Sequence, residues 1–389
     1  MRLQDTFIFL RQPWRPSLDR STRASPFKML PASSLLFAIL FLVNSLCAAS
    51  PLSPLRSLDL ANRGGDGADT SADHPYEHEP QCDDPRERKE WRKMDRDEQS
   101  SYIEAVKCFQ SLPALDPAIQ GAKTRFEEFQ SYHVVIADSV HQLGPFLPWH
   151  REFLRLYETA LRNECGYEGA NPYWDWTKDA DSLYPMAKSP IFDPVTGFGG
   201  DGVPGTYTLP NHTAVDRIFP QAFKGCVMDG PFKDLKLHIG PGFLVTDHCL
   251  TRGIDETMRK YLTSAAVANI SASPTFEIFR VQVEGEPITP DHRVHDAGHI
   301  VVGGDMSNFY SSPGDPLFYL HHAQLDRMWW KWQKLAPEHM WQVSGVATKT
   351  APFYNISLDF TLQMGNLGAS PPIRDIIDIH SERNCYTYV

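Results

Sequence analysis

Residues 315–333 read DPLFYLHHAQLDRMWWKWQ, and they are the most informative part of the chain for predicting the fold. Apolar residues recur in it at helical spacing, which predicts a long buried helix over about 316–335. On that helix His322 and Asp326 stand one turn apart on the same face. A carboxylate next to a metal-binding imidazole typically orients it, so we expect Asp326 to orient His322.

A pair of histidines lies upstream, in His295-Asp-Ala-Gly-His299. Residues i and i+4 of a helix share a face, so a helix over 295–302 would let both imidazoles reach one metal ion. The pair His292 and His295 is an alternative, although helical geometry favours His295 with His299. Residues 300–304 (IVVGG) are strand-like in composition.

The first half of the chain carries another set of three histidines. His133 and His141 fall on a helix expected over 124–142, and His150 lies at the start of the next, which Pro148 opens and Gly166 follows. Two sets of three neutral imidazoles, without thiolate or carboxylate, suit copper or zinc, and copper especially. Further helices are expected over 90–109 and 254–268, with long loops over 185–250.

These histidine motifs resemble those of a known family. His141 to His150, with PFLPWHR at 145–151, is similar to the CuA motif of tyrosinases, catechol oxidases and related polyphenol oxidases; the run from His295 through residues 315–333 resembles their CuB motif. The resemblance covers roughly residues 82–389. It implies a mainly α-helical fold, with a central four-helix bundle holding two copper ions and long disulfide-tied loops around it. The copper ligands it implies are His133, His141 and His150, then His295, His299 and His322, with His321 supporting the site.

The same resemblance suggests oxidation of phenols or o-diphenols to o-quinones by O₂. Glu284 is similar to the family's water-holding glutamate, and Asp296 would be its partner in deprotonating a monophenol. Phe309 and Phe318 stand where plant-type and bacterial-type members place a gating phenylalanine. Ser139 occupies the position of a cysteine that many members join to the second histidine, so that crosslink is not expected.

Other functions use some of the same residues. A haemocyanin-like oxygen carrier would use the same six histidines. A zinc hydrolase is suggested by His295–His299, one substitution from the HExxH motif, but it leaves the first three histidines unexplained. For the oxidase, the substrate could be a free diphenol, an aminophenol or a tyrosine in a peptide, as in tailoring a secondary metabolite.

The N-terminal region predicts export. Residues 35–46 are apolar, too few for a membrane span, and Cys47-Ala-Ala-Ser50 follows them, so residues 1–49 are expected to be an extension and secretory signal. A retained signal would instead anchor the chain in a membrane. Residues 50–80, rich in Pro, Gly, Asp and Ser, are expected to be a linker or propeptide, and residues 81–389 the catalytic domain.

Cysteines, sequons and charge agree with a secreted enzyme. Six cysteines remain after the signal, enough for three disulfides, and Cys226 with Cys249 is the favoured pair. Glycosylation sequons begin at Asn211, Asn269 and Asn355. The 389-residue chain has 37 basic and 48 acidic residues, a net charge of −11, so nucleic acid is not an expected partner.

Overall fold

The computed structural model describes residues 80–285 and 291–389. The expected signal, and all but the last residue of the expected linker, lie outside the described residues. Within the described ranges, no helix is long and apolar enough to cross a membrane.

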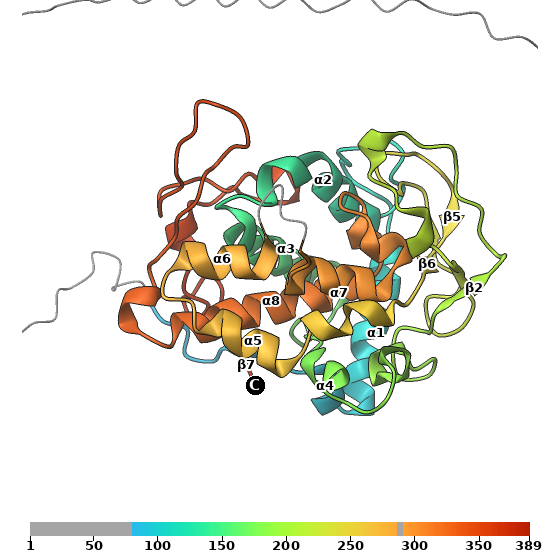
Figure 1. Ribbon diagram of the computed structural model, residues 1–389, viewed down its shortest axis with the longest axis horizontal. Helices are drawn as coiled ribbons and strands as arrows, with labels where there is room; N and C mark the ends of the chain where they lie inside the picture. Colours follow the sequence, from blue (N-terminus) through green and yellow to red (C-terminus); the bar gives the residue numbers. More distant parts are fainter. Residues whose placement is uncertain (1–79, 286–290) are drawn as a thin grey trace, which may run out of the picture. The chain divides into compact units, whose positions relative to one another are not determined.

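Four helices form the centre of the fold: α2 (Arg125–Val140), α3 (Phe146–Cys165), α7 (Val294–Val302) and α8 (Leu317–Gln333). Figure 1 shows α3, α7 and α8 in the middle of the molecule with α2 alongside. Helix α8 packs on both α3 and α7, and nearly all its side chains are buried. The expected mainly α-helical fold with a central helical bundle is confirmed.

Local signals position the two helices that carry the first histidines. Thr124 caps α2 in a reciprocal capping box with Glu127, which satisfies two N–H groups of the first turn. Helix α3 ends at Gly166, whose left-handed conformation (φ 66°) lets the chain turn away. The turn between the helices is tight, with Gln142 also at positive φ (60°). Residues 141 and 150 are thereby brought close together.

The outer helices differ in part from expectation. Helix α1 spans Arg96–Ser111, after a separate 3-10 turn at Trp91–Lys93. The helix expected over 254–268 is divided into a 3-10 segment, Glu256–Tyr261, and α5 (Ser264–Ser271). Helix α4 covers Thr177–Ala180, and α6 (Phe276–Glu284) was not expected.

The strand-like composition of residues 300–304 does not produce a strand, and the helix expected over 295–302 is confirmed. Residues Ile300, Val301 and Val302 complete α7, and Gly303 ends it at positive φ (73°). Their β-branched side chains favour strands only weakly. Burial of Val301 and Val302 in the core outweighs that preference.

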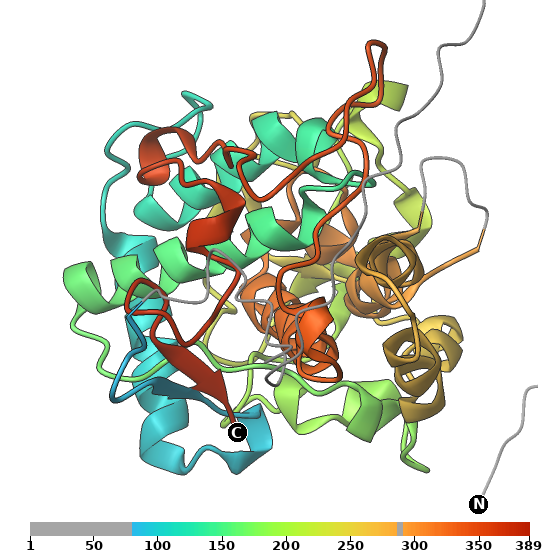
Figure 2. The ribbon, with the colours of Figure 1, turned by 90° about the vertical axis from the view of Figure 1, so that its left-hand side faces the viewer.

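Short strands tie the loops together. Strands β2 (Gly202–Pro204), β3 (Gly225–Val227) and β6 (Thr251–Arg252) form an antiparallel sheet, and β4 (Lys236–Leu237) pairs with β5 (His248–Cys249). The region expected to be only loops thus holds brief strands and 3-10 turns. Strands β1 (Arg86–Arg88) and β7 (Tyr386–Tyr388) pair in parallel, so the chain near residue 86 lies beside the C-terminal residues (Figure 2).

Three disulfides join all six cysteines of the described region. Cys226–Cys249 is the favoured pair and is confirmed; the others are Cys82–Cys385 and Cys108–Cys165. The first of these closes the same junction as β1 and β7. No cysteine of this region is left for a crosslink to His141, in agreement with Ser139 at the usual position.

Candidate metal centre

His133, His141 and His150, here called the first triad, come together at the ends of α2 and α3. His133 lies within α2, His141 is the residue that ends it, and His150 lies in the first turns of α3. All three are buried, with ring centroids 5.0 to 5.8 Å apart. Their ring nitrogens form one group that could hold a metal ion.

Backbone carbonyls set the tautomers of the first triad. Each Nδ1 lies 2.6 to 2.9 Å from a carbonyl oxygen, that of Tyr310, Ala137 and Phe146 respectively. A carbonyl only accepts, so Nδ1 carries the proton and Nε2 keeps its lone pair. The Nε2 atoms of His133 and His150 are buried without a hydrogen-bond partner, which fits metal ligands.

His295, His299 and His322 form the second triad. His295 and His299 stand one turn apart on α7, and His322 faces them from α8. The Nε2 atom of His299 lies 3.1 Å from the Nε2 atoms of both others, while its Nδ1 donates to the Met306 carbonyl at 2.9 Å. Three nitrogens converging this closely around an unprotonated Nε2 fit a bound cation.

His321 is close enough to be grouped with the second triad, but both its nitrogens have protein partners. Its Nε2 donates to the His295 carbonyl at 3.0 Å, and its Nδ1 accepts from Trp176 Nε1 at 3.3 Å. Gly298 makes room for the ring, since a Cβ there would lie 2.1 Å from His321 Cε1. His321 therefore supports the site through His295.

The two triads face each other. The rings of His150 and His322 stack at 4.3 Å, and those of His141 and His295 at 5.6 Å. Phe318 packs beneath both triads, 5.2 Å from His133 and 4.2 Å from His322. It is fully buried, so the gate expected at Phe318 is wrong: this ring is part of the core under the site.

Burial keeps these histidines neutral. It lowers the pKa of His133 to about 4 and that of His299 to about 3. Burial, with repulsion from neighbouring histidines, lowers the pKa of the other four triad members well below the usual value. A neutral imidazole is the form that binds a metal.

A cavity of about 270 Å³ opens onto the triads. His141, His295 and His299 line it, together with Phe309 and Asp296. The half-buried Phe309 ring lies 4.9 Å from that of His141, which places it at the entrance. Substrate could therefore approach both triads past Phe309.

Glu284 is the last residue of α6 and does not lie in a loop. Its Oε1 accepts from the backbone N–H of Gln142 at 2.6 Å, and Oε2 is buried without a hydrogen-bond partner. Burial raises the pKa of Glu284 well above the usual value, and repulsion from Asp296 adds to the rise.

Asp296 accepts from the Arg293 backbone N–H at 2.6 Å and pairs with His292. That pairing occupies His292, so the structure favours His295 with His299 over the alternative pair.

The expectation that Asp326 orients His322 is wrong, because both oxygens of Asp326 have other partners. One of its oxygens accepts from Arg151 Nε at 2.6 Å, and the other from the hydroxyls of Tyr386 and Tyr388 at 2.7 and 2.6 Å. Arg151 directly follows His150 on α3, and Asp326 lies one turn after His322 on α8. The ion pair between Arg151 and Asp326 therefore joins the two helices next to the triads. Asp326 thus fixes the helices and the C-terminal strand.

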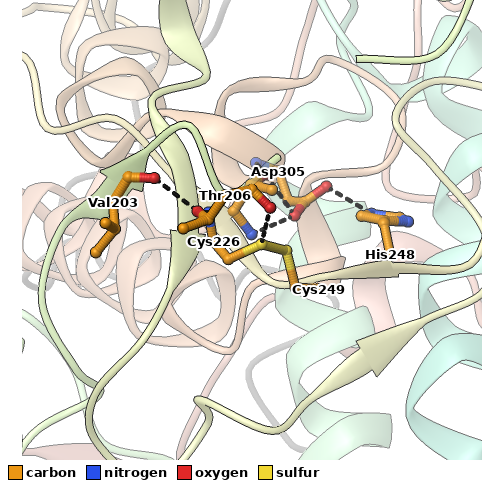
Figure 3. Close-up of a disulfide and its surroundings, with 7 residues drawn as sticks. Val203, Thr206, Cys226, His248, Cys249 and Asp305 are labelled. Carbon is orange, nitrogen blue, oxygen red and sulfur yellow. Dashed lines mark hydrogen bonds and ion pairs between the residues drawn. A yellow bond between two sulfur atoms is a disulfide. The ribbon is translucent and has the colours of Figure 1, made fainter. Parts of the chain in front are cut away.

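Sequence reasoning missed the support beneath His299. Asp305 accepts from the Thr251 backbone N–H and hydroxyl, both at 2.8 Å, and pairs with His248 Nε2 at 3.1 Å. Figure 3 shows this pair beside the Cys226–Cys249 disulfide. The next residue, Met306, supplies the carbonyl that holds His299. A backbone acceptor leaves no mark in the sequence.

The asparagines of the three sequons, Asn211, Asn269 and Asn355, are exposed. Each is therefore accessible to a glycosylating enzyme, and glycosylation stays a prediction.

Two facing histidine triads in the centre of a helical bundle define a dinuclear metal protein, and the all-imidazole donors suit copper.

The family model for the common central domain of tyrosinase matches residues 123–335. The N-acetyl-6-hydroxytryptophan oxidase ivoB of Emericella nidulans is 34% identical, over 77% of this chain and 91% of that protein. Tyrosinase ustQ of Aspergillus flavus is 34% identical, over 79% of this chain and 81% of that protein. A solved polyphenol oxidase variant from Thermothelomyces thermophila aligns with a TM-score of 0.67 and 30% identity, over 78% of this chain and 89% of that chain.

The chain belongs to the tyrosinase family. It is a copper-dependent oxidoreductase with a dinuclear copper site, and O₂ is its co-substrate.

Proposed function

We propose that the protein oxidises phenols and o-diphenols to o-quinones with O₂. The observation that carries this proposal is the pair of facing triads, with free Nε2 lone pairs, at the base of a cavity that can admit an aromatic ring. The copper ligands we assign are His133, His141 and His150 for one ion, and His295, His299 and His322 for the other.

The bound copper pair supplies the activation of O₂ and accepts electrons from the phenolic substrate. Each o-diphenol loses two electrons and two protons, and two diphenols reduce one O₂ to two waters. Phe309 lies where it can contact the substrate ring. We assign Glu284, whose pKa burial raises and whose Oε2 lies 3.6 Å from Arg280, as the group that takes the monophenol proton through a water. Asp296, which lines the cavity, would assist it.

The substrate and setting belong to this proposal. The names of the relatives include an oxidase of N-acetyl-6-hydroxytryptophan and a tyrosinase, so family membership leaves open which aromatic is oxidised. A free diphenol, an o-aminophenol and a tyrosine in a peptide are the candidates, with tailoring of a secondary metabolite as the role. Three disulfides support action in the secretory pathway or outside the cell.

The test is O₂ uptake by copper-loaded protein with tyrosine, catechol, an o-aminophenol and a tyrosine-containing peptide. We expect catechol to be consumed fastest and the zinc-loaded protein to take up no O₂. Reversible O₂ binding without consumption of any substrate would instead show an oxygen carrier. Full hydrolytic activity with one zinc and no copper would show a zinc hydrolase.

A further inference from the structure

Two cations flank the aromatic ring at the cavity entrance. The guanidinium carbon of Arg217 lies 4.0 Å from the centre of the Phe309 ring, and Lys349 Nζ lies 5.5 Å from it. The same ring lies 4.9 Å from His141 of the first triad. Two positive charges thus stand one ring away from a copper ligand.

Separate parts of the chain bring these cations together. Arg217 follows a 3-10 turn in a left-handed conformation (φ 47°), and its carbonyl accepts from Asn308 Nδ2 at 3.3 Å. Asn308 directly precedes Phe309, so Arg217 is tied to the entrance. Lys349 comes from the chain after α8 and also acts on Glu284, whose pKa it lowers against the larger effect of burial.

A single carboxylate is shared between the two cations. Asp138 lies 3.4 Å from Arg217 and 3.3 Å from Lys349, and it also accepts from the Tyr310 hydroxyl at 3.1 Å. Its side chain is 55% exposed, and ion pairs this long and exposed are weak. Among the residues that the structure describes, Asp138 is the only carboxylate in ion-pair contact with Arg217 or Lys349.

We propose that Arg217 and Lys349 bind a carboxylate carried by the substrate, so that the enzyme prefers phenolic acids over neutral phenols. This inference rests on the proposed phenol oxidation. The phenol end enters beside Phe309 towards the triads, and the carboxylate stays at the entrance, in place of Asp138 or beside it. Asp138 shows that a carboxylate can lie between the two cations.

The test compares 3-(3,4-dihydroxyphenyl)propionate with its methyl ester, which differ in charge but share the reacting ring. We expect wild type to have the higher kcat/KM for the acid. Arg217→Met with Lys349→Met should lower the acid-to-ester ratio about tenfold, and each single change about threefold. Arg217→Lys keeps the charge and should keep most of the preference, while Lys107→Met, on the exposed surface of α1, matches the loss of charge and should leave the ratio unaltered.

Of two further measurements, the first does not depend on these substitutions and the second does not depend on turnover. Raising the salt concentration should reduce the preference of wild type for the acid, because salt screens exposed charges. Calorimetry with 3-phenylpropionate, which has no phenol to oxidise, should show binding to copper-loaded wild type and weaker binding to the double variant.

The outcomes separate the two proposals. An acid-to-ester ratio that is the same in wild type and double variant, or insensitive to salt in wild type, overturns the carboxylate site. Failure of both acid and ester to consume O₂, with 3-phenylpropionate binding still dependent on the two cations, overturns the proposed oxidation but keeps the anion site.

Discussion

His321 and His322 are neighbours in the chain with the same side chain, yet their ring nitrogens differ in what they contact. Those of His321 are taken by Trp176 and the His295 carbonyl. Nε2 of His322 points instead at Nε2 of His299, 3.1 Å away. This difference, and not the residue type, favours His322 over His321 as the proposed ligand.

Replacing His322 by Ala should reduce bound copper from two ions per chain to one, because the second triad keeps only two donors. Elemental analysis after copper loading measures this directly. The matched control is His339→Ala, since His339 is buried but stacks on Trp332 at 4.0 Å, away from both triads. Two coppers retained in the His322 variant would contradict the assignment.

Replacing Glu284 by Gln should reduce monophenol oxidation at least tenfold and diphenol oxidation much less. Gln keeps an oxygen for the Gln142 N–H but loses the carboxylate that could take a proton. A monophenol, with a pKa near 10, needs that deprotonation more than a diphenol does. Initial rates with tyrosine and catechol, at equal copper content, test this. Equal loss of both activities would show that Glu284 acts only in holding the His141–Gln142 turn.

At the scale of elements, α7 and α8 approach closely at Gly298. A glycine in the middle of a helix normally lowers the free energy of unfolding by about 1 kcal/mol relative to alanine. In a helix with free space around this position, Gly→Ala would therefore stabilise the protein. Here the added Cβ would collide with the His321 ring. A glycine is therefore needed at position 298 because the two helices pack closely there, and not because the backbone has to be flexible.

We expect Gly298→Ala to destabilise the protein by about 1–3 kcal/mol and to weaken copper binding at the second triad more than at the first. Thermal unfolding and copper content are the measurements. Ala265→Gly, on the exposed side of α5, makes the reverse change away from the site and should cost about 1 kcal/mol with both coppers kept. A gain in stability for Gly298→Ala would show that the two helices can separate without cost.

Asp326 holds α3, α8 and β7 together. Burial by itself would raise its pKa, but Arg151 and Arg88 outweigh that effect and lower the pKa below its usual value. Asp326→Asn would leave the buried guanidinium group of Arg151 without its counter-charge, while Arg88 keeps its ion pair with Glu158. The free energy of unfolding should therefore fall by about 3–5 kcal/mol. Denaturant unfolding measures this. Lys224→Gln removes a partly exposed pair with Asp201 and should cost less than about 1 kcal/mol. A similar small loss for Asp326→Asn would show that its ion pairs stabilise little.

At the scale of the whole molecule, six neutral histidines are concentrated in one buried site. In the unfolded chain each would bind a proton near pH 6.5, whereas in the folded protein His133 and His299 do so only near pH 4 and 3. Between those values the unfolded state binds more protons, so stability falls as the pH falls.

The copper-free protein should therefore lose unfolding free energy steadily from about pH 6.5 towards pH 4, by up to about 3 kcal/mol for each histidine that stays neutral in the folded state. Denaturant unfolding at several pH values measures it. Bound copper should shift the loss to lower pH, since the metal competes with protons for Nε2. A stability that is flat over this range would show that the histidines are protonated in the folded state.

The chemistry of the site and most of the bundle can be predicted from the amino-acid sequence. The spacing of His295, His299 and His322 places them on two helix faces, and helical periodicity with caps such as Thr124 and Gly166 marks the helices. These signals are local, because side chains one turn apart share a face whatever surrounds them. Nearness in sequence also favoured Cys226–Cys249.

Contacts between residues far apart in the chain became visible only in the folded structure. Asp326 was expected beside a ligand and instead contacts Arg151 and the C-terminal tyrosines; Phe318 was expected as a gate and lies under the triads. Residues 300–302 became helix because the core buries them. The backbone carbonyls that set the histidine tautomers, and the meeting of Arg217 with Lys349 at Phe309, arise from packing between distant segments. Contacts of this kind depend on loop paths, and no local pattern encodes them.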